Sequence, residues 1–159
     1  MDCVFDKLAE LKIGYERHEH PAVFTSTEAT EHWADIKGAH CKNIFLRDSK
    51  GRQHYLVVVG FHKQIQIKDL QSTIGSTRLS FASEQRLEKY LNLKPGSVSP
   101  FGLINDTENH VKVIIDSDLK QEAFVNFHPN INTQTLTLSF EDFEKYLLWT
   151  GNEIRFLKL

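Results

Sequence analysis

The 159-residue chain has a formal net charge of −2, from 19 basic and 21 acidic residues, and 40% of its residues are hydrophobic. This balance argues against a protein that coats nucleic acid by charge alone, which needs clustered Lys and Arg, and against a disordered or fibrous chain. The two cysteines, Cys3 and Cys41, give no disulfide framework, and no apolar run approaches the ~20 residues of a membrane span. We therefore expect a single cytoplasmic domain over residues 1–159, with no membrane partner.

The first half of the chain predicts two helices followed by a β-hairpin. Thr25 with Glu28 fits a capping box, the reciprocal pair that starts a helix. Residues 48–51 (DSKG) are typical of a turn and separate two apolar strands, which predicts the hairpin. In chain order we expect an amphipathic helix ended by Gly14, a strand over 15–20, a helix over about 26–35, and strands over 41–47 and 53–59.

The second half mixes short helices and strands. Ser83 can cap a helix, and Ser139 with Asp142 fits a second capping box. Because turns join most of the strands, we expect an antiparallel or mixed sheet and an α+β fold. The expected elements are helices over 68–74 and 84–91, strands over 101–104, 111–116, 123–127 and 133–138, a last helix with Phe140, Phe143, Leu147 and Leu148 on one side, and a return to the sheet at 153–157.

Familiar catalytic and cofactor motifs are absent from the sequence. It has no GxGxxG, P-loop, GxSxG or HExxH pattern. Its eight histidines show no spacing of a structural zinc site, so we expect no metal and no cofactor. Cys41 is a candidate nucleophile, since the ammonium of the adjacent Lys42 could lower the thiol pKa. Neighbours in a strand point to opposite faces, however, and we favour a packed Cys41.

Lys42 and two polar loops remain as candidates for a ligand site. A lysine within an apolar strand normally lies at an edge or turns outward; the functional alternative is an ammonium that faces a cleft and stabilises negative charge. The loop KPGSVSP could offer the backbone N–H groups of Gly96, Ser97 and Val98 to a ligand. These features outline a pocket but define no reaction. The turn FHPNINT adds His128, Asn130, Asn132 and Thr133.

Five segments in a fixed order carry a resemblance to a known family. They are PAVFTSTEA, GAHCKNIFLRD, YLVVV, LSFASEQRLEKYLNLKPGSVSPFGLIND and FHPNINTQTLTLSFEDFEKYL. This series resembles the aminoacyl-tRNA trans-editing family that includes YbaK, the bacterial prolyl-tRNA synthetase insertion domain and the stand-alone alanyl-tRNA(Pro) deacylases. The resemblance runs from about residue 15 to the C-terminus, and KNIFLRD with HPNINTQT looks more like the alanine-removing branch than the cysteine-removing one.

The resemblance implies a fold, a substrate and a set of site residues. The implied fold is a curved, barrel-like mixed or antiparallel sheet with flanking helices around a small pocket. The implied substrate is the aminoacyl ester at the acceptor end of tRNA(Pro), with prolyl-tRNA synthetase as a further partner. Lys42 matches the family's essential lysine, Gly96 opens its glycine-xxx-proline loop, and His128 lies in its histidine-containing turn, so these three are the expected catalytic residues. The expected substrate-binding residues are Asn43, Ser97, Val98, Ser99, Pro100, Asn130 and Thr133.

The implied reaction is hydrolysis of an activated ester, so the enzyme mainly needs to hold the ester, admit water and stabilise the oxyanion. We expect Lys42 to bind near the ester and the terminal adenosine, and the Gly96 loop to donate its amides to the carbonyl oxygen. No side chain is an evident general base, and His128 is the one candidate; the vicinal hydroxyl of the terminal ribose is a group that could assist. The alternatives are a Cys-tRNA(Pro) deacylase, a non-catalytic tRNA-binding or synthetase-associated module, and a small-molecule amide or ester hydrolase.

Overall fold

A computed structural model describes residues 2–22, 33 and 35–159. The helix expected over about 26–35 lies almost wholly outside these residues. In chain order the elements are α1 (Asp2–Glu10), β1 (Glu16–Glu19), β2 (Ala39–Arg47), β3 (His54–Gly60), α3 (Ile67–Ile74), β4 (Ser80–Phe81), α4 (Glu84–Leu91), the 3-10 helix η1 (Pro100–Asn105), β5 (Lys112–Asp116), the 3-10 helix η2 (Ser117–Gln121), β6 (Phe124–Phe127), β7 (Gln134–Ser139), α5 (Phe140–Thr150) and β8 (Ile154–Leu157).

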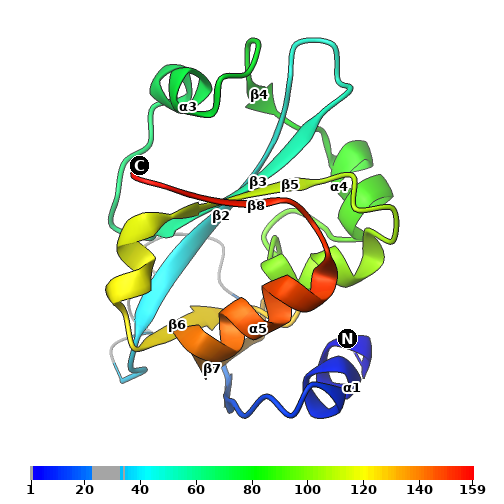
Figure 1. Ribbon diagram of the computed structural model, residues 1–159. Coiled ribbons are helices and arrows are strands. Elements are labelled where there is room, and N and C mark those ends of the chain that lie inside the picture. Colours follow the sequence, from blue (N-terminus) through cyan, green and yellow to red (C-terminus); the bar gives the residue numbers. More distant parts are fainter. Residues whose placement is uncertain (1, 23–32, 34) are drawn as a thin grey trace.

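The strands form one mixed sheet in the order β1-β7-β6-β2-β3-β5-β8, with β4 paired to β2 (Figure 1). The long strand β2 joins two parts of this sheet. Its start pairs in parallel with β6 through Ala39 and His40, and from Cys41 to Arg47 it pairs antiparallel with β3. The predicted hairpin and α+β class are therefore confirmed, and the curved sheet stays open, since β1 and β8 are its two ends.

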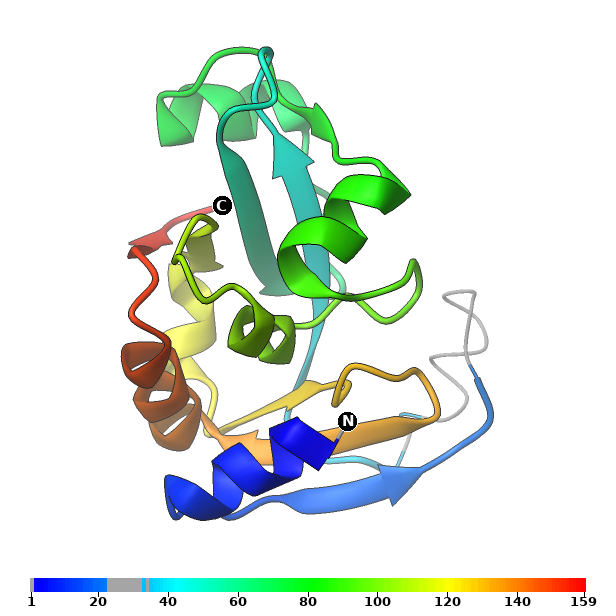
Figure 2. The same cartoon turned by 90° about the vertical axis from the view of Figure 1, so that its right-hand side faces the viewer.

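Alternation along β2 sends its side chains into two separate apolar cores. Cys41 and Phe45 belong to the larger core, which also takes residues from α1, α4, η1 and α5. Ile44 and Leu46 face the opposite way, into a smaller core closed by α3. Figure 2 shows α4 and η1 along one side of the β2–β3 pair, while α1 lies at the end of the molecule occupied by β1 and β7.

The strand expected over 101–104 is wrong, because this segment is the 3-10 helix η1. Ser99 caps it by accepting a hydrogen bond from the Phe101 N–H at 3.1 Å, and Pro100 supplies the fixed φ of a first helical residue. Gly102 lets the turn approach the neighbouring chain closely, since a Cβ there would lie 2.6 Å from Leu93 Cδ1. Apolar content alone could not distinguish this buried turn from a strand.

Two further details of the expected helices are wrong. α1 ends at Glu10 and the chain turns at Lys12, whose φ of +60° is left-handed, so Gly14 does not end it. In α5 the Leu148 side chain is 79% exposed, because it lies about 140° around the helix from the buried Phe143. Tyr146 is the buried residue there instead.

The predicted helix caps at Ser83 and Ser139 are confirmed. The Ser83 side chain accepts a hydrogen bond from the Arg86 N–H, and the Ser139 side chain accepts one from the Asp142 N–H. Within residues 2–22, 33 and 35–159, no helix is long and apolar enough to cross a membrane.

Candidate active site

A small cavity lies where the two parts of the sheet meet. Its volume is about 20 Å³, enough for one water molecule or a group of similar size. Cys41 and Asn43 line it from β2, Asn126 from β6, Thr135 from β7, and His128 from the turn between β6 and β7. Strand pairing brings these distant residues together, because β6 lies between β2 and β7.

Asn126 fixes the meeting point of β6 with the start of β2. It is 4% exposed, and its amide donates to the backbone oxygens of Lys37 and Ala39 at 2.8 and 3.2 Å. Its Oδ1 accepts from the Thr137 hydroxyl at 2.5 Å. A buried amide with every group bonded is a rigid joint, so this wall of the cavity is held in place.

His128 has one ring nitrogen without a hydrogen-bond partner among the described residues. Its Nδ1 lies 2.7 Å from the Gln134 carbonyl oxygen, which can only accept, so Nδ1 carries the proton and Nε2 is the acceptor of the neutral ring. Burial lowers the pKa of His128 below its usual 6.5, against the opposing effect of the Gln134 carbonyl. At neutral pH the side chain is therefore an uncharged base with a fixed tautomer.

The glycine-proline loop reaches this cavity through Asn43, whose Nδ2 donates to the Val98 carbonyl at 3.2 Å. Gly96 has a φ of +86°, a conformation that glycine adopts without strain. The Ser97 N–H is used in a turn to Lys94 at 3.1 Å, whereas the N–H groups of Gly96 and Val98 have no partner among the described residues. Two of the three predicted amides are thus available.

Ser99 and Pro100 hold the loop from inside. Both are buried; Ser99 caps η1, and the Pro100 carbonyl accepts from the Tyr146 hydroxyl at 2.8 Å. In the other predicted loop, Asn130 has a φ of +66° and a buried Oδ1 without a hydrogen-bond partner. The Thr133 side chain is exposed, and its backbone oxygen accepts from the His20 N–H.

Lys42 lies on the opposite face of β2 from Cys41 and Asn43, because side chains alternate along a strand. Its ammonium donates to the backbone oxygen of Lys63 at 2.5 Å and lies 5.8 Å from the centre of the Phe61 ring. Phe61 and Lys63 both line a larger hollow of about 670 Å³. The structure therefore gathers Asn43, the Val98 segment and His128 at the small cavity, and places Lys42 beside the larger hollow.

Trp33 and His40 line both the small cavity and the larger hollow. Their rings stack with centroids 4.1 Å apart. Trp33 Nε1, His40 Nε2 and, in the small cavity, Asn43 Oδ1 are buried and have no hydrogen-bond partner within residues 2–22, 33 and 35–159. Unpaired buried polar atoms are rare in folded proteins, so these three are candidates to bond to a ligand.

Nucleophilic and metal chemistry find no support in the described part of the chain. Burial raises the pKa of the Cys41 thiol to about 12, so Cys41 is not a thiolate nucleophile at neutral pH. No group of three or more His, Cys, Asp or Glu side chains among the described residues could hold a metal ion.

Sequence reasoning missed His40, Asn126, Thr135 and Trp33 as lining residues. Asn126 alone carried a signal, as an amide within the otherwise apolar strand AFVNF.

The family profile named "Aminoacyl-tRNA editing domain" matches residues 20–146 of this chain. The chain belongs to the aminoacyl-tRNA editing domain family. It is 49% identical over 159 residues to the prolyl-tRNA editing protein ProX of Acetoanaerobium sticklandii, covering 99% of this chain and 96% of that protein. It is 39% identical over 151 residues to the prolyl-tRNA synthetase associated domain-containing protein 1 of Bos taurus, covering 92% of this chain and 88% of the relative.

The fold also matches a solved structure. A crystal structure described as a candidate trans-editing enzyme for prolyl tRNA synthetase superposes with a TM-score of 0.71 at 20% identity, covering 98% of this chain and 94% of that one. The predicted family and its editing-domain fold are thereby confirmed, and with them the predicted class of enzyme, a hydrolase of aminoacyl-tRNA.

Proposed function

We propose that this protein hydrolyses the aminoacyl ester of mischarged tRNA(Pro), and that alanine is the amino acid it removes. The observation that carries the proposal is the small cavity at which a neutral, tautomer-fixed His128 meets Asn43. Membership of the editing family supplies the reaction class, and the relative named as a prolyl-tRNA editing protein supports tRNA(Pro) as the substrate.

The size of the cavity supports alanine. About 20 Å³ accepts a group the size of a methyl, whereas the three methylene groups of the proline ring do not fit. Exclusion by shape protects correctly charged tRNA. A difference of one methylene in binding discriminates only about 10–200-fold, which would protect it less well. Asn43 Oδ1 is then available to accept a hydrogen bond from the α-ammonium of the bound amino acid.

His128 is the base in this proposal. Its Nε2 accepts a proton from water as the water attacks the ester carbonyl, and the proton passes to the departing ribose oxygen. The Gly96 and Val98 N–H groups, which have no partner among the described residues, are the donors to the oxyanion in this proposal. The carbonyl of Gln134 keeps the imidazole in the reactive tautomer throughout.

The terminal nucleotide occupies the larger hollow beside Lys42. A volume of about 670 Å³ is in the range of pockets that hold small molecules. Because Trp33 and His40 border both spaces, one substrate can place its acyl group in the cavity and its adenosine in the hollow. Lys42 contributes a positive charge there for the phosphates. The chain's net charge of −2 gives few other phosphate contacts, which fits a binding mode limited to the acceptor end of the tRNA.

The test is release of labelled amino acid from Ala-tRNA(Pro), Cys-tRNA(Pro) and Pro-tRNA(Pro). We expect rapid release of alanine, slow release of cysteine and none of proline, with loss of activity in Lys42→Ala and His128→Gln. Lys50→Ala, in the exposed 48–51 turn, is the matched control for the loss of a lysine. Faster release of cysteine than alanine would move the specificity to the cysteine branch, and no release from any of the three would leave a non-catalytic tRNA-binding module.

A further inference from the structure

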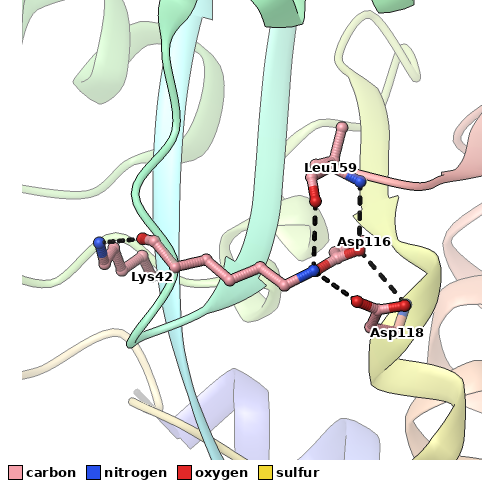
Figure 3. Close-up of polar contacts among 5 residues, drawn as sticks. Lys42, Asp116, Asp118 and Leu159 are labelled. Atoms are coloured by element: carbon pink, nitrogen blue, oxygen red, sulfur yellow. Dashed lines mark hydrogen bonds and ion pairs between the residues drawn. The ribbon is translucent and has the colours of Figure 1, made fainter.

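Lys63 is the centre of a charged network with Asp116, Asp118 and Leu159, and these three partners are labelled in Figure 3. Its ammonium lies 2.6 Å from Asp116 Oδ2 and 2.6 Å from Asp118 Oδ2, and donates to the Leu159 backbone oxygen at 3.2 Å. Asp116 is 1% exposed, at the end of β5, and its Oδ1 accepts from the N–H groups of Asp118 and Leu159 at 3.3 and 3.4 Å. The Lys63 side chain is therefore tied to two separate backbone segments, residues 116–118 and the C-terminal Leu159.

The backbone of Lys63 holds Lys42 at the same time. The Lys63 carbonyl accepts a hydrogen bond from the Lys42 ammonium. Lys63 therefore contacts the two aspartates through its side chain and Lys42 through its backbone. The segment 61–63 has few other hydrogen bonds among the described residues. In its backbone, the Phe61 N–H donates to the His40 oxygen at 2.8 Å and the Lys63 N–H donates to the Gly60 oxygen at 3.0 Å. The side-chain anchor therefore determines where the Lys63 carbonyl lies, and that carbonyl determines where the Lys42 ammonium lies.

We propose that Lys63 is a positioning residue for Lys42, held in place by Asp116 and Asp118. This inference rests on the proposed function for its effect on catalysis, because Lys42 is the residue that it orients. A lysine side chain has four rotatable bonds, and a fixed acceptor at its end removes much of that freedom before substrate binds. The pKa of Lys63 is raised by its hydrogen bonds to the two aspartates, so the anchor keeps its charge throughout the working pH range.

The catalytic test is a double-mutant cycle between Lys63→Met and Lys42→Ala, measured by single-turnover release of alanine. We expect Lys63→Met to slow release about tenfold in the wild-type background and to have little effect when Lys42 is already absent. Lys63→Arg, which keeps the charge, should restore most of the rate. Asp118→Asn removes the more exposed partner, leaves the buried Asp116 paired, and should give a smaller loss in the same direction.

A second readout needs no activity. Acylation of the Lys42 amine by an N-hydroxysuccinimide ester, followed by peptide mass spectrometry, should rise several-fold in Lys63→Met, since the carbonyl partner is no longer fixed. Labelling at Lys50 should stay unchanged. If wild type releases no amino acid but the labelling of Lys42 rises as expected, the proposed function fails and the positioning stands.

The positioning role would be overturned if Lys63→Met slowed release equally with and without Lys42. It would also be overturned if the labelling of Lys42 were unchanged in both Lys63→Met and Asp118→Asn. Thermal unfolding of each variant shows which of them is folded at the assay temperature. If Lys63→Met is unfolded there, Asp118→Asn and Lys63→Arg carry the same comparison.

Discussion

Two histidines in this protein, His54 and His128, share a lowered pKa but differ in what surrounds them. His54 is fully buried; Arg86 donates to its Nε2 at 3.1 Å, and its Nδ1–H donates to His110 Nε2 at 2.9 Å. His128 uses Nδ1 in the same way, toward Gln134, but its Nε2 has no partner in the described part of the chain. Burial is the largest cause of the lowered pKa in both.

The difference separates a structural imidazole from a reactive one. At His54 both ring nitrogens are bonded and aromatic rings, including Tyr90 at 4.3 Å, pack against the imidazole, so nothing further can bind. At His128 a base of fixed tautomer borders a cavity of about 20 Å³. A lowered pKa alone therefore does not identify a functional site; the available nitrogen does.

The largest expected effect is on catalysis at His128. His128→Gln keeps a side chain that can bond to Gln134 but removes the base, and deacylation of Ala-tRNA(Pro) should slow about 100-fold or more. His54→Gln, the matched change at the other histidine, should retain the wild-type rate at a temperature where the variant is folded. Single-turnover release of alanine at saturating enzyme measures both rates. Equal rates for the two variants would remove the distinction between the two histidines.

The next effect is on stability at low pH, and it belongs to His54. Its pKa is lowered from 6.5 to about 4, so the unfolded chain binds a proton that the folded chain refuses between those values. Stability should be full above about pH 6.5 and fall by about 3 kcal/mol as pH decreases toward 4. Urea unfolding at a series of pH values measures this fall. The fall should be clearly smaller in His54→Gln, and an unchanged fall would show that another group is responsible.

A smaller effect is expected on the choice of amino acid. Cys41→Ala removes a sulfur from the wall of the small cavity and enlarges it. Release of cysteine from Cys-tRNA(Pro) should then rise about tenfold relative to release of alanine, the order of one added group in an apolar pocket. Cys3→Ala, at an exposed position of α1, is the control. An unchanged ratio would mean that the acyl group binds elsewhere.

Much of the fold follows from local patterns in the sequence. The turn at 48–51 predicts the β2–β3 hairpin, and Ser83 and Ser139 predict their helix starts, because each signal lies within a few residues of its effect. The pairing of β1 with β7 has no such local signal, since more than 100 residues separate the strands. The 3-10 turn after Ser99 reads as a strand because its residues are apolar and buried.

The site was predictable only in part for the same reason. Resemblance identifies Asn43, Val98 and His128, and the structure brings them to one region. Alternation along β2 predicts that Lys42 faces away from Cys41, but not which side holds the cavity. That side is decided by the parallel pairing of β2 with β6, a contact between residues about 85 apart in sequence.

The smallest expected effect is a shift in the pH dependence of the reaction. His20 lies 6.0 Å from His128 between ring centroids, and its positive charge at low pH lowers the pKa of His128 further, after burial. The rate should fall with decreasing pH as His128 takes up a proton, with the midpoint of this fall below 6.5. His20→Asn removes the nearby charge, so the midpoint should move to higher pH while the rate at neutral pH changes little. Profiles of kcat/KM from about pH 5 to 8 measure the shift, and a midpoint that moves to lower pH would place the titrating group elsewhere than His128.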